Sequence, residues 1–507
     1  MSQPKIAAAI DIGSNAIKML IAEIEGPGQL RVLEDVRLDS PIGDDTFTNG
    51  RIRPEAMFSV CRSLKHMSQL MKDYGVRHYR AYATSGVREA SNSLYFLEHV
   101  RQATQMDVEL IDRSVERFLT YQSLNYGLTA MPTLRAEGLL MVEIGSAGVQ
   151  MSVFADGKLR FSDHVRIGTL KLKEILDSLR GESLQYTEVL QQYIESQLGM
   201  LHERIQAYNL PHYLVLGGET ASLVQRTHEL VLDVRGMSTD VFNRYHRDII
   251  QSGTFKLAHK FQLDEERADQ MIPTSIIMSE LWKATAAEHV LIPDLSLRHG
   301  VLHQLAAEWS DGTLSDTYVA DMIATALHTA ERYQLDIAHS LKVKELATKL
   351  LHKCNASFHL DASYELCLQL AAILHDIGKH ISQEGHAANS YHMLKSMDML
   401  GITDKQKEII ASIALYHPRG TMVPIRPELS TEENIALARL TSLLKLADAL
   451  DCSHRQKVQD IKITWQHGEY LQVKPLYEGS LELETWAFMQ ESPSFEQISG
   501  YPIRLKP

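Results

Sequence analysis

Cysteine is scarce in this chain of 507 residues and follows no recognisable spacing. The four cysteines are Cys61, Cys354, Cys367 and Cys452. None of them forms a C-x-x-C pair, which argues against both a disulfide framework and a zinc ribbon. The sequence therefore predicts a cytoplasmic protein from a reducing compartment.

Long apolar runs and an excess of basic residues are also missing. The stretch Ile6–Ile10 is too short for a signal segment, and no run approaches the roughly 18 apolar residues of a membrane span. Acidic residues outnumber basic ones by 64 to 51, giving a formal net charge of −13. We expect no membrane and no duplex nucleic acid as partner, so a phosphate-rich ligand would need a local basic or backbone N–H site.

The composition that remains is that of an ordinary globular protein. Apolar residues make up 44% of the chain and charged residues 23%, which excludes global disorder, collagen-like repeats and coiled coil. At roughly 150 residues per domain, the length suggests about three domains.

One segment near the N-terminus recurs later in the chain. The paired positions are Asp11 and Glu143, Gly13 and Gly145, Ser14 and Ser146, and Met19 and Met151, at a constant offset of 132 residues. Each copy reads as an apolar strand ending in an acid, a Gly-Ser turn, a second strand and a hairpin turn. The repeat predicts two related α/β lobes.

Each Gly-Ser turn suits an anion. Backbone N–H groups and a hydroxyl can point at the anion, and the preceding acid can hold a divalent cation or orient a water. Both copies together can clamp one phosphate chain in a cleft between the lobes. A plain glycine turn is the alternative for either copy alone, and the repetition of acid-Ile-Gly-Ser argues against it.

Two further loops favour a phosphate ligand. Thr84, Ser85 and Arg88 fall at the end of a short strand and the start of a helix, where N–H groups and a guanidinium attract anions. The run 213–221 is a buried strand followed by Gly217, Gly218 and a helical start, a geometry that places a phosphate near the end of a strand. A diglycine turn can equally be an ordinary turn between two elements that binds no ligand.

The second half of the chain changes character after the polar stretch 309–316. From residue 317 to about 451 the pattern is mostly helical, for example over 319–333 and 362–374. Within it, the segment Leu374-His-Asp-Ile-Gly-Lys379 predicts a helix on which His375, Asp376 and Lys379 face one pocket.

The His-Asp pair can ligate one metal or bridge two, and further donors are available on other predicted helices. The candidate metal ligands are His339, His375, Asp376, His386, His417 and Asp448. Such ligands suit Mn, Fe, Zn, Ni or Mg, and the site would activate water against phosphorus with Lys379 on a phosphate oxygen. Any one of these histidines alone is more often a satisfied or solvated side chain, so the ordered set carries the prediction.

The tail reads as a hairpin over 461–473 with a turn at His467-Gly468, followed by a helical stretch over 483–489. We expect a small α+β cap without chemistry of its own. The predicted domains are residues 1–125 and 126–310 for the two lobes, 311–452 for the helical domain and 453–507 for the cap.

The order and spacing of these motifs resemble the exopolyphosphatase/guanosine pentaphosphate phosphatase (Ppx/GppA) family in its long form. The matching landmarks are Asp11-Ile-Gly-Ser-Asn15, Ala83-Thr-Ser-Gly-Val-Arg88 with Asn92, Glu143-Ile-Gly145, Gly217-Gly218 and Arg298-His-Gly-Val-Leu302, followed by the helical domain. The resemblance implies an α/β actin-like (ASKHA, ribonuclease H-like) two-lobe domain, an all-α HD-type domain and a small α+β C-terminal cap. It also implies Mg-dependent attack of water on the terminal phosphate of polyphosphate or guanosine pentaphosphate, and a homodimer.

Some positions depart from the family pattern. Val115 stands where a glutamate usually orients the attacking water, and on a helix its neighbour Glu116 points about 100° away. The segment 143–150 lacks one glycine and the usual hydroxyls and closes with Gln150 instead of a carboxylate. Ala16 and His299 also replace a hydroxyl and a glutamate that are common there.

Two hypotheses follow. The first is a phosphohydrolase that releases terminal phosphate from polyphosphate or guanosine pentaphosphate, with Glu116, Asp11 and Glu143 at the cleft and a second metal-dependent centre in the HD-type domain. The second is a catalytically impaired sensor that binds polyphosphate or an alarmone, since a valine cannot take a proton.

Overall fold

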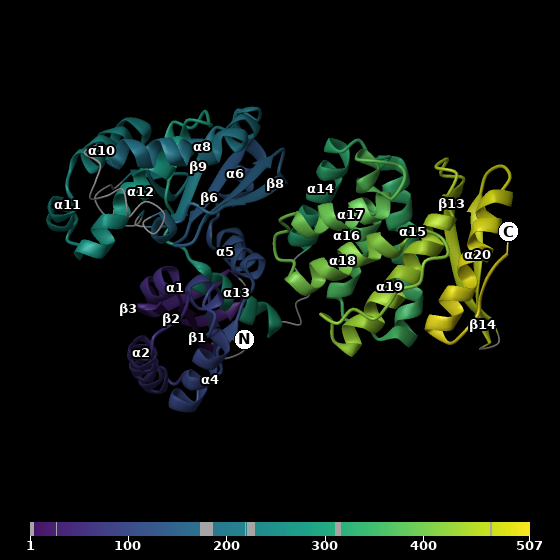
Figure 1. The fold of residues 1–507 in the computed structure, drawn as a ribbon, viewed down its shortest axis with the longest axis horizontal. Coiled ribbons are helices and arrows are strands. Elements are labelled where there is room, and N and C mark those ends of the chain that lie inside the picture. Colours follow the sequence, from purple (N-terminus) through teal and green to yellow (C-terminus); the bar gives the residue numbers. More distant parts are fainter. Residues whose placement is uncertain are drawn as a thin grey trace. The chain divides into compact units, whose positions relative to one another are not determined.

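The computed structural model in Figure 1 describes residues 5–506 except for 27, 173–185, 219, 221–228, 310–315 and 467–468. The chain divides into two compact units, residues 1–313 and 314–507. The stretch 310–315, where the sequence predicts a boundary, lies outside the described residues, as do Pro27 and the predicted turn at His467-Gly468. No helix of the described part is long and apolar enough to cross a membrane.

The first unit holds two sheets of related topology. Their strand orders are β3-β2-β1-β4-β5 and β10-β11-β12-β9-β6-β7-β8. The strands of the first sheet are β1 (Lys5–Ile12), β2 (Ala16–Gly26), β3 (Gln29–Asp39), β4 (His78–Ala83) and β5 (Glu109–Leu110). Those of the second are β6 (Leu139–Ile144), β7 (Val149–Ala155), β8 (Lys158–Val165), β9 (His212–Gly217), β10 (Glu229–Val231), β11 (Val234–Ser238) and β12 (His289–Leu291).

The repeat in the sequence is a repeat of this topology. β1, β2 and β3 form an antiparallel meander with β4 parallel to β1, and β6, β7 and β8 do the same with β9 parallel to β6. The turns match in detail: the N–H of Gly13 donates to the carbonyl of Ala16 at 3.0 Å, and that of Gly145 to the carbonyl of Gly148 at 2.9 Å. Two related α/β lobes are therefore confirmed.

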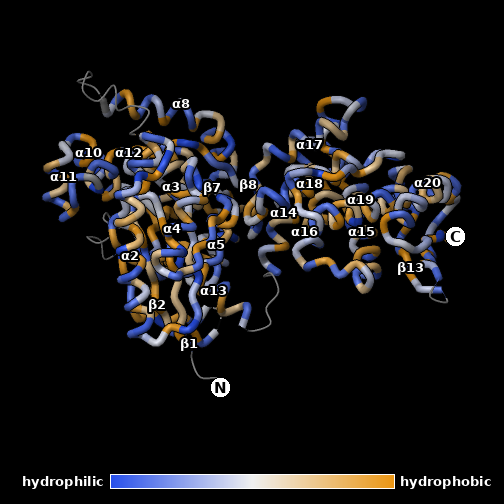
Figure 2. The backbone as a smooth tube through the Cα atoms, turned by 60° about the horizontal axis from the view of Figure 1, so that its bottom comes forward, coloured by the Kyte–Doolittle hydropathy of each residue, from blue (hydrophilic) through white to orange (hydrophobic). Residues whose placement is uncertain are grey.

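Helices cover the sheets and bury their apolar faces. They are α1 (Ile42–Asn49), α2 (Pro54–Asp73), α3 (Ser85–Arg88), α4 (Ser93–Thr104), α5 (Arg113–Gly127), α6 (Met131–Glu137), α8 (Tyr186–Gln206), α10 (Thr239–Gln251), α11 (Thr254–Phe261), α12 (Glu265–Trp282) and α13 (Leu297–Glu308). α2 and α4 share one core with β1 and β2, and apolar residues concentrate on those strands (Figure 2). α8, α10 and α12 pack into the core of the second sheet.

α13 carries the chain back to the first sheet. It packs against β1, β2 and α5 although the predicted boundaries put its residues in the second lobe, and those boundaries stay a prediction. Gly300 permits this contact, because a Cβ at that position would lie 1.8 Å from the carbonyl oxygen of Leu119 on α5. Arg298 donates to the carbonyl of Met19 at 3.0 Å and pairs with Asp35. The Arg298–Leu302 motif thus anchors α13 on the first sheet and on α5.

The second unit is largely helical, as the sequence predicts, and ends in a small sheet. Its helices are α14 (Asp316–Arg332), α15 (Ile337–Phe358), α16 (Ser363–Leu374), the short 3-10 helix η1 (Ile377–His380), α17 (His386–Ser396), α18 (Asp404–Tyr416), α19 (Thr431–Ala449) and α20 (Glu482–Ser499). The strands β13 (Val458–Gln466), β14 (Tyr470–Tyr477) and β15 (Ile503–Leu505) form the order β13-β14-β15. The predicted tail hairpin is confirmed, and the helix after it is longer than predicted.

The prediction of one helix through Leu374–Lys379 is wrong. α16 ends at Leu374, and Lys379 lies in η1. The cause is α17, which approaches so closely that a Cβ on Gly378 would lie 2.1 Å from the carbonyl oxygen of His386. The N–H of Gly378 donates to Oγ of Ser390 at 2.9 Å, so it is not available for an α-helical bond.

We predict that Gly300→Ala destabilises the first unit by about 1–3 kcal/mol or more, because the added methyl group overlaps the backbone of α5. Gly199→Ala is the matched control, since Gly199 lies within α8 and a methyl group added there would meet nothing within 4 Å. That variant should gain about 0.5–1 kcal/mol from helix propensity. Thermal unfolding followed by circular dichroism measures both, and equal effects would contradict the packing argument.

Candidate functional sites

A pocket in the first unit collects polar groups from both lobes. It is lined by Ser85, Arg88, Arg113, Glu116, Arg117, Glu143, Gly145, Ser146, Ala147, Gly148, Gln150 and His164. α3 and α5 supply the first five of these residues, and the others come from β6, the turn after it, β7 and β8. The pocket thus joins the repeated turn of the second lobe to the basic end of α5.

The predicted anion loop after β4 lies on this pocket. Arg88 donates to the carbonyl of Ile111 at 2.9 Å and to Oε2 of Glu116 at 3.0 Å. The hydroxyls of Ser85 and Ser14 lie 3.1 Å apart, so the first repeated turn touches the pocket through Ser85.

Glu116 lies in the pocket and Val115 does not. Val115 packs against the core shared by β1, β2 and α13, whereas Glu116, the next residue on α5, lines the pocket beside Arg88. The apolar face of α5, with the buried Leu119 and the partly buried Val115, fixes the rotation of the helix, and the position about 100° from Val115 then faces the cleft. A carboxylate is therefore present in the pocket despite the valine at the expected position.

The carboxyl groups around this pocket influence one another. Burial, and then the negative charge of Glu116, raise the pKa of Glu143 to about 8. Burial also raises the pKa of Asp11 and of Glu116, and Asp11 adds to the effect on Glu116. Thr120 donates to Oε1 of Glu143 at 3.1 Å, and Thr84 donates to Oδ1 of Asp11 at 3.4 Å. Three acids that resist ionisation together suit a divalent cation.

Several predicted phosphate ligands lie elsewhere. Asn15 donates from Nδ2 to Oε1 of Gln270 at 2.8 Å. Gly217 and Gly218 are not among the pocket-lining residues, and the N–H of Gly218 donates to the carbonyl of Ile144 at 2.7 Å. These two glycines have φ of 74° and 55°, which supports their role as turn residues. The helical start predicted after them falls within residues that the structure does not describe.

Sequence reasoning missed Arg113, Arg117 and His164. The two arginines are four residues apart at the start of α5, a spacing that places both on one helix face. His164 could not be found from its neighbours in sequence, because it reaches the pocket through the pairing of β7 with β8. A Cβ on Gly148 would lie 2.2 Å from Nε2 of His164, so this glycine makes room for the imidazole.

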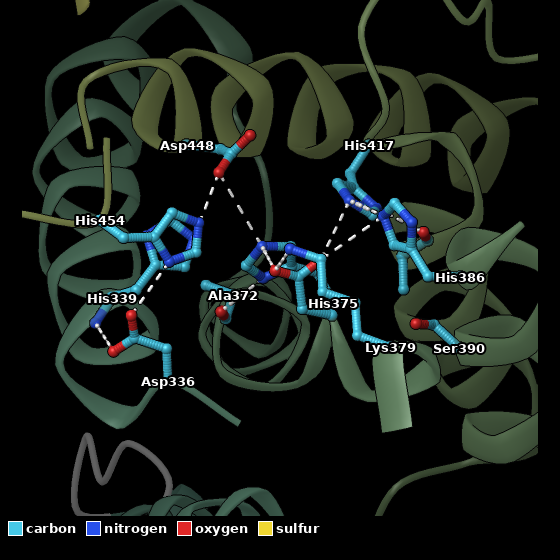
Figure 3. A network of polar contacts seen from close by, with 12 residues as sticks. Asp336, His339, Ala372, His375, Lys379, His386, Ser390, His417, Asp448 and His454 are labelled. Atoms are coloured by element: carbon cyan, nitrogen blue, oxygen red, sulfur yellow. Dashed lines mark hydrogen bonds and ion pairs between the residues drawn. The ribbon is translucent and has the colours of Figure 1, made fainter. Parts of the chain in front are cut away.

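In the second unit, the predicted metal ligands converge. Figure 3 shows the imidazoles of His339, His375, His386 and His417 facing a shared space with Asp448. His339 lies at the start of α15 and His386 at the start of α17. His375 follows the end of α16, His417 follows the end of α18, and Asp448 lies in the last turn of α19.

Asp376 is the shared member of this cluster. Its oxygens lie 3.6 Å from Nε2 of His375, 3.5 Å from Nε2 of His386 and 3.6 Å from Nε2 of His417. Two groups of candidate donors meet at it, one with His339 and His375 and one with His386 and His417. Nε2 of His339 lies 3.3 Å from Oδ1 of Asp448, which closes the ring of donors.

Each imidazole is held through its other nitrogen. Nδ1 of His375 donates to the carbonyl of Ala372 at 2.9 Å. Nδ1 of His417 donates to the carbonyl of Ala414 at 2.7 Å, and Nδ1 of His386 donates to that of Gln383 at 3.0 Å. This pattern fixes the tautomer that leaves Nε2 as a metal ligand.

His339 is held by carboxylates rather than by a carbonyl. Its Nδ1 lies 2.9 Å from Oδ2 of the buried Asp451, and Asp336 caps α15 by accepting the N–H of His339 at 3.1 Å. His454 stacks on the His339 ring with centroids 3.8 Å apart and also pairs with Asp336 at 3.0 Å. Sequence reasoning missed Asp451, whose position three residues after Asp448 on the same chain turn was the available signal.

The carboxylates of this cluster favour a cation. Although burial opposes it, Asp448 and Asp451 raise the pKa of His339 to about 9, so a bound metal would take the place of a proton on that ring. Burial opposes ionisation of Asp376, but His375, His417 and Lys379 hold its pKa well below the usual range. Burial lowers the pKa of His375 to about 4, which keeps that ring neutral and able to bind a metal. Oδ1 of Asp376 is buried and has no hydrogen-bond partner among the described residues. The donors therefore fit a divalent metal.

A cavity of about 250 Å³ opens onto these donors. Lys379 lines it and contacts Asp376, while Arg419 and His454 line it from the other elements. The predicted juxtaposition of Lys379 with Asp376 is thus present although the predicted helix is not.

Comparisons with known proteins agree with this architecture. The model of the Ppx/GppA phosphatase family matches residues 20–308, and that of Ppx/GppA phosphatase, domain III, matches residues 323–485. A guanosine-5'-triphosphate,3'-diphosphate pyrophosphatase of Aliivibrio fischeri strain MJ11 is 24% identical over 95% of this chain and 95% of its own. One of Aeromonas hydrophila is 23% identical over 100% of this chain and 99% of its own.

A solved structure shows the same fold for the lobes. The exopolyphosphatase of Cytophaga hutchinsonii superposes with a TM-score of 0.54 at 20% sequence identity, covering 61% of this chain and 100% of that one. The fold assignment of the two lobes as actin-like rests on this match together with the duplicated sheets.

We predict that Glu143→Gln stabilises the metal-free protein at pH 8 and has less effect at pH 5. The pKa of Glu143 rises from its ordinary 4.5 to about 8 in the folded state, so the folded protein retains a proton that the unfolded chain releases. Wild-type stability should therefore fall as the pH rises through this window. The expected difference in melting temperature at pH 8 is on the order of 3 °C or more.

Thermal unfolding in the presence of a chelator measures this effect. Glu109→Gln, at an exposed position on β5, is the control and should shift neither curve. A loss of stability in Glu143→Gln at pH 8 would contradict the argument.

Proposed function

The chain belongs to the Ppx/GppA phosphatase family, and from that premise we propose that it releases terminal phosphate from inorganic polyphosphate or a phosphorylated guanosine nucleotide at the interlobe pocket. The observation that carries the proposal is the position of Glu116, which lines the pocket beside Arg88 and acts electrostatically on Glu143. The names of full-length relatives support the nucleotide, and the name of the structural relative supports the polymer.

Some residues of the pocket bind phosphate, and one transfers a proton. Arg88, Arg113 and Arg117 attract phosphate oxygens, and the hydroxyls and N–H groups of Ser85 and the 145–148 turn position them. Arg88 also holds Glu116 in place as the base that takes a proton from water.

Asp11 and Glu143 are the proposed ligands of Mg²⁺. Both carboxyl groups have a raised pKa because of burial, which a cation would reverse. Bound Mg²⁺ would neutralise charge on the phosphate oxygens. The protein's own part is to keep two acids at the end of the repeated strands β1 and β6.

We further propose that the helical domain is a second, metal-dependent phosphohydrolase centre of HD type. Its support is the buried Oδ1 of Asp376 without a hydrogen-bond partner in the described part, surrounded by imidazoles fixed through Nδ1. Mn, Fe, Zn, Ni or Mg suits this donor set, which consists of two groups of residues that share Asp376. A bound metal would supply an acidic water for attack on phosphorus, and Lys379 would hold a phosphate oxygen.

A sensor of polyphosphate or an alarmone is the second candidate function. It is favoured by Gln150, which lines the pocket as a neutral amide and donates to Oγ of Ser162 at 2.7 Å. In this case the lobes would bind intact ligand, and hydrolysis, if any, would occur in the helical domain.

We predict that Glu116→Gln lowers the release of phosphate from polyphosphate or guanosine pentaphosphate by about 10²–10⁴-fold, because the general base is lost. Asp376→Asn should leave that activity within about twofold and abolish metal-dependent hydrolysis of simple phosphoesters. Phosphate release by the purified full-length protein with Mg²⁺ or Mn²⁺ measures both.

The matched controls are Glu109→Gln and Glu384→Gln, which change exposed carboxylates near the respective elements. Slowly reversed binding of intact polyphosphate without phosphate release from wild type would contradict hydrolysis at the interlobe pocket and favour the sensor.

We also predict that purified protein binds one or two transition-metal ions per chain and that His417→Ala lowers this number. Asp451→Asn should weaken metal affinity by about 10–100-fold, because Asp451 orients His339 without being a ligand. Elemental analysis and competition with a chelator provide the measurements. His352→Ala removes an exposed histidine as the control, and equal metal loss in that variant would refute the assignment.

A further inference from the structure

Arg419 is a cation at the edge of the helical-domain donors. It follows His417 by two residues and lines the same cavity as Asp376 and Asp448. Its guanidinium lies 5.2 Å from the centre of the Trp486 ring on α20, and Cys452 lines the same cavity as Arg419. No carboxylate among the described residues forms an ion pair with Arg419, whereas Lys379 is paired with Asp376.

Trp486 lies on α20, where it contacts Arg419 and lines a second cavity of about 480 Å³. That cavity is bounded by Tyr477, Leu481, Trp486 and Met489. Trp486 is 51% exposed and Met489 64% exposed, so this apolar surface is accessible from solvent.

The charges of the two cavities differ in a way that selects a ligand. The cavity at the metal donors is lined by the cations Lys379 and Arg419 as well as by Asp376 and Asp448. The second cavity is lined by the carboxylate of Glu482, and the described residues contribute no lysine or arginine to it. An inorganic polyphosphate would place negative charge against an acid and an apolar wall there. A phosphoester with an aromatic group would instead place phosphate at Arg419 and its ring at Trp486.

We propose that Arg419 is a phosphate-binding residue of the helical centre, that Trp486 positions it, and that the groove beyond Trp486 holds the organic group of an aromatic phosphoester. The inference rests on the proposed metal-dependent function of this centre and names its substrate class. In the reaction, the oxygen of water bonds to phosphorus, the phosphorus–oxygen ester bond breaks, and the leaving alcohol takes a proton from that water. The C-terminal domain, expected to have no chemistry of its own, completes the site.

Binding of two unreactive probes tests the inference independently of turnover. Phenylphosphonate and methylphosphonate share a phosphonate group and lack an ester bond, and calorimetry compares their affinities for the full-length protein with Mn²⁺. Wild type should bind phenylphosphonate about tenfold more tightly, the preference expected of one stacked ring. Arg419→Ala should weaken both probes at least tenfold, as loss of a hydrogen bond from a charged group implies.

Trp486→Ala should abolish the preference for the aromatic probe, and Trp486→Phe should restore most of it. Leu483→Ala, an exposed apolar change on α20 outside both cavities, should bind both probes like wild type. Equal affinity of the two probes for wild type would overturn the inference, as would identical behaviour of Trp486→Ala and Leu483→Ala. Loss of hydrolysis in wild type with the preference retained would refute the proposed function but not the ring-binding groove.

Discussion

A buried carboxylate requires a positive partner, and both candidate centres of this protein are built around that requirement. In the first unit, burial raises the pKa of Asp11, Glu116 and Glu143, and the negative charge of Asp11 adds to the effect on the other two. In the second unit, imidazoles and Lys379 surround Asp376 and hold its pKa low. The three carboxyl groups of the first unit therefore resist ionisation until a cation binds, whereas Asp376 in the second unit is already ionised.

The duplication supplies the first arrangement. Each repeated strand, β1 and β6, ends in an acid that is followed by a turn closed by the same hydrogen bond, Gly13 to Ala16 and Gly145 to Gly148. Two such turns from different lobes provide acids and N–H groups at the ends of β1 and β6, which lie in different sheets. Arginines from α3 and α5 add the charge that an anion needs in a chain whose net charge is negative.

The centre in the helical domain is built from residues at helix ends and not from a sequence repeat. Its donors lie at helix termini, where caps and carbonyl acceptors fix them: Asp336 caps the helix that carries His339, and Ala372 and Ala414 accept from the rings of His375 and His417. Metal ligands set in this way lose little conformational freedom when an ion binds. A metal-dependent centre here would add chemistry in the domain that follows the two lobes.

The sequence by itself determined the family, the duplicated lobes, the helical domain and the residue types of both sites, because strand–turn spacing and the order of His and Asp residues are local or periodic properties. Only the tertiary structure decided which of Val115 and Glu116 faces the cleft, because the packing of Leu119 and the partly buried Val115 against β1, β2 and α13 sets the rotation of α5. It also ended α16 at Leu374, since the close approach of α17 to Gly378 is invisible in a helical pattern. His164 and the Arg419–Trp486 contact depend on strand pairing and on packing between distant segments, and no local spacing encodes them.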